Sequence, residues 1–188
     1  MLELTPPTGW LARWEQDAGL TQGAVHDVLG DVFAAGSVGT ITQAQVIAAA
    51  QTRLAVPPAM LDRFWADLWD EYLGTLNLDL YDWFRALRPA RRTGILSNSF
   101  IGAREREHER YGFADIVDVL VYSHEVGLAK PDPAVFALTG ERLGVPPGDV
   151  VFLDDTPRMV EAARQAGWHA VEFQNTRQAI AEVEALLA

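Results

Sequence analysis

The sequence predicts an α/β fold in which a parallel sheet is combined with an inserted unit of helices. From Gly9 to about Leu87, apolar residues recur every three or four positions, as in helices that bury one face. After Pro89, short apolar runs alternate with helical stretches, which is typical of βαβ units on a parallel sheet. A length of 188 residues allows one core with a smaller appended unit.

Local signals mark the starts of two helices in the first half. Thr42 followed by Gln45 has the spacing of a capping box, in which each residue satisfies a backbone N–H of the other. Pro57 and Pro58 indicate the entrance of the next helix. No convincing strand is predicted in this half. An aromatic stripe on that next helix is expected to pack in the core: Phe64, Trp65, Trp69 and Tyr72.

The second half contains four predicted strands, and a last helix is expected after Asn175. Ligands of open α/β sheets bind at the carboxyl ends of the strands, so the residues that follow each run are candidate site residues. The predicted strands are Thr93–Leu96, Ile116–Tyr122, Val150–Leu153 and His169–Phe173.

Composition excludes several classes of function. A net charge of -11 argues against a surface that binds nucleic acid or anionic lipid. The absence of cysteine excludes thiolate nucleophiles, disulfides and Cys-ligated metals. No apolar run is long enough for a membrane span and no targeting segment is visible, so a cytoplasmic location is the default expectation. The mixed-charge run from Arg104 to Arg110 predicts a solvated helix face.

The first candidate site segment is Ser97-Asn98-Ser99, directly after a predicted strand. It offers a hydroxyl, an amide side chain and backbone N–H groups, which together can hold a phosphate oxygen. Serine and asparagine are also ordinary turn residues, so a purely structural turn is the alternative.

Lys130 is the second candidate, within a segment whose prolines at 131 and 133 fix the backbone. A lysine on a rigid turn can serve as a point charge for an anion. The alternative is a lysine that is simply exposed on a loop.

Asp154 and Asp155 stand side by side at the end of the third predicted strand. Adjacent carboxylates repel each other and are costly to desolvate unless a cation lies nearby. Oxygen ligands of this kind suit Mg²⁺, which binds through one or two carboxylates and a substrate phosphate. The alternative is a helix N-cap.

Together these segments resemble the haloacid dehalogenase superfamily, and most closely the subgroup that includes the phosphatase domain of soluble epoxide hydrolase. The resemblance implies a Rossmann-like core over residues 1–9 and 88–188, with an α-helical cap inserted at residues 10–87. The matching motifs are Ile95–Asn98, Gly127–Pro133, Val151–Thr156 and Ala162–Gly167.

By this resemblance the chain is a hydrolase of the Mg²⁺-dependent phosphatase type, acting on a small phosphorylated metabolite. Ser97 and Lys130 would be catalytic, and both would bind the phosphoryl group together with Asn98. Asp155 would bind Mg²⁺, while Asp154 orients the site or binds the metal through water. A dehalogenase is less favoured, because a paired acidic motif for Mg²⁺ serves phosphoryl transfer.

The sequence departs from the family at its first motif. The family's nucleophilic Asp, which forms an aspartyl-phosphate, follows an N-terminal central strand, whereas Met1–Leu4 matches what comes after that turn. We therefore expect two unpaired strand edges, a gap in the core and weak Mg²⁺ binding. Two alternatives stay open: a phosphatase whose strand and nucleophile lie upstream of Met1, or a catalytically silent binding or assembly protein. A homo-oligomer is compatible with both.

Overall fold

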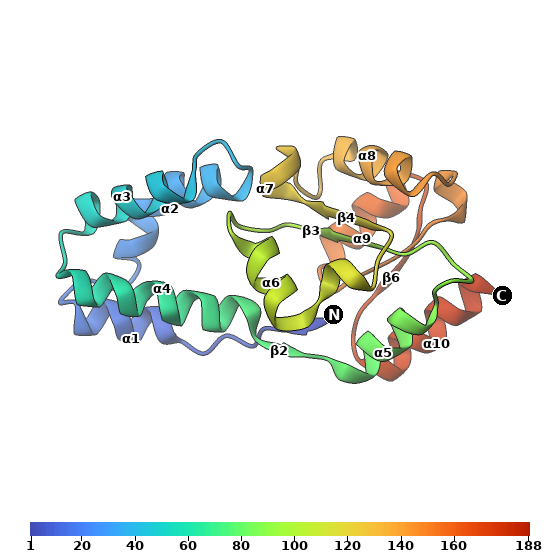
Figure 1. The fold of residues 1–188 in the computed structure, drawn as a ribbon, viewed down its shortest axis with the longest axis horizontal. Helices are drawn as coiled ribbons and strands as arrows, with labels where there is room; N and C mark the ends of the chain where they lie inside the picture. The colour runs from blue at the N-terminus through green and yellow to red at the C-terminus, as the bar shows by residue number, and fades with distance from the viewer.

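Four helices follow the short strand β1 (Glu3–Leu4) and form a helical lobe, residues 10–73, at one end of the molecule (Figure 1). The computed structural model describes all residues, 1–188. Trp14, Leu29 and Phe64 are almost completely buried at the centre of the lobe. The helices are α1 (Trp10–Asp17), α2 (Ala24–Ser37), α3 (Gln43–Leu54) and α4 (Pro58–Leu73).

The predicted helix starts in this lobe are confirmed. Thr42 and Gln45 form a complete capping box at α3, and α4 begins at Pro58. Of the aromatic stripe, Phe64 is buried and packs edge-to-face against Trp14. The other three aromatic residues are only partly buried.

The remaining residues form an α/β lobe, in which strands and helices alternate as predicted. Asn175 caps the final helix with its side chain, which confirms the predicted helix start. The elements are β2 (Thr75–Leu76), α5 (Leu78–Ala86), β3 (Gly94–Ser97), α6 (Ala103–Tyr111), β4 (Val119–Tyr122), α7 (Ser123–Val126), α8 (Pro133–Leu143), β5 (Val151–Asp154), α9 (Pro157–Gln165), β6 (His169–Glu172) and α10 (Thr176–Leu187), with 3₁₀ turns at Phe113–Asp115 and Pro147–Asp149.

The parallel strands form two separate pairs. β3 pairs with β4, so that Ser97 lies opposite Tyr122, and β5 pairs with β6, so that Asp154 lies opposite Glu172. β3 and β5 are not hydrogen-bonded to each other. The sequence predicted a single parallel sheet interrupted by a missing central strand, and the two unpaired edges expected from that gap are present.

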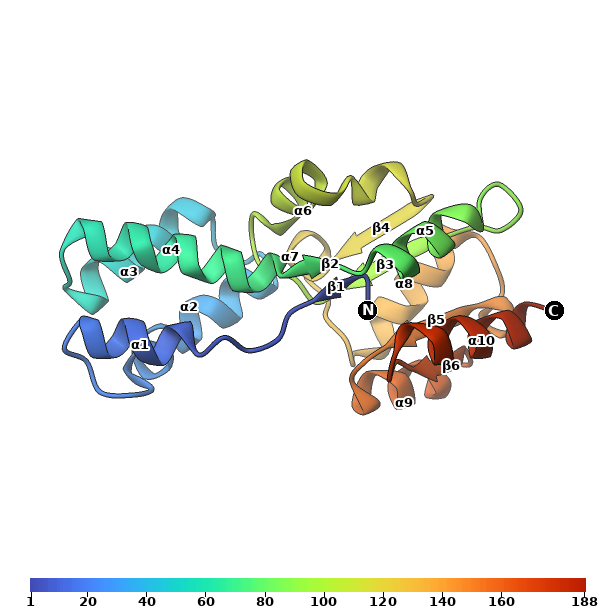
Figure 2. The ribbon, with the colours of Figure 1, turned by 90° about the horizontal axis from the view of Figure 1, so that it is seen from below.

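Helices cover both faces of the α/β lobe (Figure 2). α8 and α9 contribute Phe136 and Val160 to a buried cluster with Leu96 of β3 and Val121 of β4. α10 packs against β5, β6 and α5. Strands covered on both faces are expected to be apolar in their interior, as these four strands are, and the polar Ser97, Asp154, His169 and Glu172 stand at strand ends.

The two chain crossings between the lobes lie side by side. β1 pairs antiparallel with β2, with Glu3 opposite Leu76 (Figure 2). The sequence did not predict β2, because a strand of two residues leaves no alternating pattern. The predicted cap of residues 10–87 includes α5, whereas α5 packs against α10 of the α/β lobe. None of the helices combines the length and the apolar character that crossing a membrane requires.

Candidate active site

Lys130 joins the carboxyl ends of β3 and β5. Its backbone N–H donates to Asn98 Oδ1 at 2.7 Å, and its carbonyl accepts from Asn98 Nδ2 at 2.8 Å. Its ammonium group donates to Asp154 Oδ2 at 2.5 Å. With 9% of its surface exposed, Lys130 is not the exposed loop lysine of the alternative interpretation. The rigid turn therefore holds one positive charge at the sheet edge.

The two adjacent aspartates have different environments. Asp154 is buried, and its second oxygen accepts the backbone N–H of Thr156 at 2.9 Å. Asp155 is exposed and contacts only the Thr156 hydroxyl, at 3.5 Å. Asp154 thus shapes the turn before α9 and fixes Lys130. Asp155 remains available to a ligand.

All five predicted site residues line one cavity. Ser97 and Asn98 end the β3 side of it, Asp154 and Asp155 end the β5 side, and Lys130 lies between them. The cavity has a volume of about 1130 Å³. The cavity is large because it extends from this polar edge into the space between β3 and β5. Four residues of the helical lobe also line it: Trp10, Leu68, Glu71 and Tyr72.

The amino group of Met1 lies at the acidic end of this cavity. Burial lowers the pKa of this amino group, and the negative charges of Asp155 and Asp154 oppose that effect. The site therefore holds two carboxylates, and the Lys130 ammonium is already paired with one of them. A bound phosphate would need a further cation beside Lys130 to offset these carboxylates.

The family is identified by sequence comparison. Residues 13–167, most of the chain, match the haloacid dehalogenase-like hydrolases. The chain belongs to this family. In this haloacid dehalogenase-like hydrolase, the motifs Ile95–Asn98 and Val151–Thr156 contain the carboxyl ends of β3 and β5, Gly127–Pro133 leads into α8, and Ala162–Gly167 contains the end of α9.

Curated relatives include phosphatases. The chain is 37% identical over 90 residues to phosphatase MT3486 of Mycobacterium tuberculosis, a match covering 45% of this chain and 42% of the relative. It is also 37% identical over 67 residues to bifunctional epoxide hydrolase 2 of Sus scrofa, covering 36% of this chain and 12% of that enzyme. The chain thus spans less than half the length of these relatives. The predicted resemblance to the epoxide hydrolase subgroup is confirmed.

Solved structures show the same fold. A HAD family enzyme from Bacteroides thetaiotaomicron, solved in complex with magnesium and inorganic phosphate, superimposes with a TM-score of 0.74. The match covers 91% of this chain and 88% of the other, at 18% identity. At this identity the similarity establishes the fold of this haloacid dehalogenase-like hydrolase and nothing finer.

The donor set of the site fits Mg²⁺ incompletely. Asp155 offers free carboxylate oxygens of the kind that Mg²⁺ prefers, but Asp154 is already occupied by Lys130. No cluster of three or more His, Asp or Glu side chains in the chain has metal-binding geometry. A cation bound here would keep most of its ligands as water or substrate oxygens.

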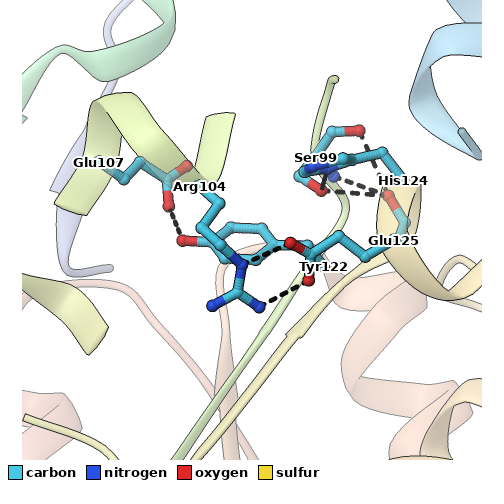
Figure 3. Close-up of polar contacts among 7 residues, drawn as sticks. Ser99, Arg104, Glu107, Tyr122, His124 and Glu125 are labelled. Atoms are coloured by element: carbon cyan, nitrogen blue, oxygen red, sulfur yellow. Dashed lines mark hydrogen bonds and ion pairs between the residues drawn. The ribbon is translucent and has the colours of Figure 1, made fainter. Parts of the chain in front are cut away.

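Sequence reasoning missed a second polar cluster, on α6 and its neighbours (Figure 3). Glu107, expected on a solvated face, is 2% exposed and accepts a hydrogen bond from the Tyr122 hydroxyl. Burial raises the pKa of Glu107 and, to about 8, that of Glu3, whose Oε1 is buried without a partner. An alternating charge run gives no signal that its middle residue faces inward.

A third set of contacts links the lobes. Ser99 Oγ lies 2.7 Å from His124 Nδ1, and the Ser99 N–H donates to Ser123 Oγ at 2.8 Å (Figure 3). Ser123 Oγ in turn donates to the carbonyl of Ser37, at the end of α2, at 2.7 Å. These bonds attach the loop after β3 to the helical lobe. They involve buried serines that do not line the cavity, so their role is structural.

Proposed function

We propose that this chain is the phosphoryl-binding body of a Mg²⁺-dependent phosphatase that acts through an aspartyl-phosphate on a small phosphorylated metabolite. The observation that carries the proposal is Lys130, whose backbone binds Asn98 and whose side chain binds Asp154. This arrangement holds the Lys130 ammonium between the end of β3, which carries the Ser97 hydroxyl, and the end of β5, which carries the Asp154 carboxylate. The mycobacterial relative is named a phosphatase, which supports the same class.

In the proposed roles, Ser97 and Asn98 hydrogen-bond the phosphoryl oxygens and Lys130 neutralises their charge. Asp155, with Asp154 behind it, would hold Mg²⁺, which would supply further charge stabilisation to the phosphoryl group. The helical lobe would act as a cap, because Trp10 and Tyr72 line the same cavity as the predicted site. Closure of such a cap excludes water from the reacting groups.

We propose further that the chain of residues 1–188 lacks its nucleophile. Asp154 is ion-paired with Lys130, and Asp155 is the proposed Mg²⁺ ligand, so the use of either as the nucleophile would remove a group that the site needs. A catalytically silent binding protein is the second candidate, favoured by the same observation. The chain should be nearly inert on its own, since loss of a principal catalytic group costs several powers of ten in rate.

The test is to extend the chain before Met1 by a strand of apolar residues that ends in Asp-x-Asp. Hydrolysis of p-nitrophenyl phosphate in Mg²⁺ should appear in the extended protein. It should vanish when the first added aspartate is changed to asparagine, and again in the extended Lys130→Ala variant. Turnover of about 1 per second or faster by the unextended chain would show that another residue is the nucleophile. An inactive extended protein that is folded and binds phosphate would favour the silent binding protein.

A further inference from the structure

The loop between β3 and α6, residues 98–102, runs from the candidate active site into the helical lobe, and we call it the β3 loop. Asn98 lies at the cavity, and two residues later Phe100 packs against the buried cluster of the helical lobe. Phe100 itself does not line the cavity. At about 3.3–3.6 Å per residue, two residues span at most about 7 Å. A displacement of Phe100 can therefore reach Asn98 through only two peptide units.

The Phe100 ring lies between two helices of the helical lobe. Its centroid is 5.8 Å from that of Phe33 on α2 and 6.2 Å from that of Trp69 on α4. Gly36 of α2 is buried against the ring, since a Cβ at this position would lie 2.4 Å from Phe100 Cε2. The ring therefore follows the position of both helices.

The last turn of α2 is linked to the β3 loop by a second route. The Ser37 carbonyl accepts a hydrogen bond from Ser123 Oγ at 2.7 Å, and Ser123 Oγ accepts the Ser99 N–H at 2.8 Å. α2 contacts α7 at this end of the helical lobe (Figure 1). Two consecutive residues of α2, Gly36 and Ser37, are thus connected to two consecutive residues of the β3 loop.

A third contact connects Phe100 with the wall of the cavity. Trp69, which packs beside the Phe100 ring, lies edge-to-face with Tyr72 at 5.2 Å, and Tyr72 lines the cavity. Arg106 Cζ lies 4.0 Å from the centroid of the Trp69 ring, which holds the indole against α6. A ligand that contacts Tyr72 is therefore separated from Phe100 by one side chain.

We propose that Phe100 is a positioning residue that couples the helical lobe to the phosphate-binding end of β3. When α2 and α4 pack on its ring, the β3 loop keeps Asn98 bonded to Lys130 and Ser97 at the cavity. This role rests on the proposed phosphoryl-binding function of Ser97 and Asn98, and it belongs to a residue outside the cavity. Because such coupling is reciprocal, a bound phosphate favours the packed position of the helical lobe.

Two amides report the coupling without a ligand, by NMR-detected hydrogen exchange in the 188-residue chain. The Ser99 N–H reports its bond to Ser123, beside Phe100. The Lys130 N–H reports its bond to Asn98 Oδ1, inside the candidate site. A residue that only fills space in the helical lobe would leave exchange at Lys130 unchanged.

Gly36→Ala should accelerate exchange at both amides by about fivefold or more, because the new Cβ displaces the Phe100 ring. Gly30→Ala is the matched control on the same helix. A Cβ at Gly30 meets no atom closer than 3.8 Å, so this variant should leave both rates unchanged. Both substitutions favour the helix equally, so a difference between them comes from the ring.

The second half of the test combines substitutions. Phe100→Ala should by itself accelerate exchange at both amides, and Gly36→Ala should add nothing in this background, because there is no ring to displace. Phe100→Leu provides a second background, and urea unfolding confirms that each variant is folded. Equal acceleration by Gly36→Ala with and without the ring would overturn the proposal. Acceleration at Ser99 with none at Lys130 would overturn it as well.

Titration with inorganic phosphate in Mg²⁺, followed by ³¹P NMR, separates this coupling from the proposed function. Phosphate affinity should fall about fivefold in Gly36→Ala and stay unchanged in Gly30→Ala. Equal affinities in the two variants would overturn the coupling. If the unmodified chain binds no phosphate, the proposed function is contradicted, whereas the exchange measurements still decide the role of Phe100.

Discussion

The Lys130 ammonium donates to Asp154 Oδ2 at 2.5 Å, and the two side chains are only 7% and 2% exposed. A buried ion pair is costly to break, because removal of one partner leaves an uncompensated charge. Asp154 also accepts the Thr156 N–H, so its loss would loosen the turn into α9. The pair therefore holds the sheet edge together as well as placing the charge.

Lys130→Met should destabilise the protein by about 3–5 kcal/mol in urea unfolding, because it leaves the Asp154 carboxylate unpaired. The double variant Lys130→Met/Asp154→Leu should recover part of this loss. Arg85→Met, which removes an exposed pair with Asp82, is the control and should change stability by less than about 1 kcal/mol. Equal effects of the buried and exposed substitutions would contradict this assignment.

Glu3 should make stability depend on pH. Its carboxyl group has a pKa raised to about 8 by burial and by the nearby Glu107, against 4.5 for an ordinary Glu. The folded protein therefore keeps a proton that the unfolded chain releases, and stability falls as pH rises from about 4.5 to about 8. One such proton gives a slope of at most about 1.4 kcal/mol per pH unit.

Glu3→Gln should flatten this slope in urea titrations at several pH values, because the amide mimics the protonated acid. The exposed Glu182→Gln variant should retain the slope of the unmodified protein. An unchanged profile for Glu3→Gln would mean that Glu3 is ionised in the folded state.

Asp155→Ala should weaken Mg²⁺ binding, which calorimetry should already find to be weak in the unmodified chain, because few protein oxygens are available. Asp149→Ala removes another exposed carboxylate at the same cavity and should leave binding unchanged. Micromolar affinity that survives Asp155→Ala would rule out the proposed metal role of Asp155.

Gly39→Ala should separate the helical lobe from α7. A Cβ at Gly39 would lie 1.8 Å from the His124 carbonyl oxygen, and the residue has a φ of +67°. Gly23 has a φ of +89° but no atom within 4 Å of its Cβ position, so Gly23→Ala isolates the backbone strain of about 1–2 kcal/mol. Gly39→Ala should cost clearly more and should speed amide exchange at His124. Equal losses of stability in the two variants would show that the helical lobe can move away from His124 without a further loss of stability.

Much of the architecture was predictable because it depends on short-range patterns in the sequence. The capping box at Thr42 and the strand ends at Ser97 and Asp154 follow from local periodicity and turn chemistry. Burial of Lys130 could not be derived, because it depends on Asn98 and Asp154, each more than 20 residues away in sequence. The inward orientation of Glu107 likewise depends on Tyr122, a long-range partner.

The separation of the strands into two pairs could be predicted only indirectly, because strand pairing depends on tertiary packing. A parallel strand is recognised by its apolar run, but its neighbours are fixed by tertiary packing. The sequence motifs predicted which residues meet at the sheet edge, and the structure places all five around one cavity. What each residue does there remains a prediction for the experiments above.

The antiparallel contact between β1 and β2 also makes the helical lobe exchangeable. The chain leaves the α/β lobe at Leu4 and returns at Thr75, and these two residues are direct partners in the register. The lobe between them contains its own buried cluster around Trp14 and Phe64. A two-residue Asn-Gly turn could therefore close the same strands into a hairpin. A different insert could therefore replace the helical lobe at this point while the rest of the chain keeps its topology.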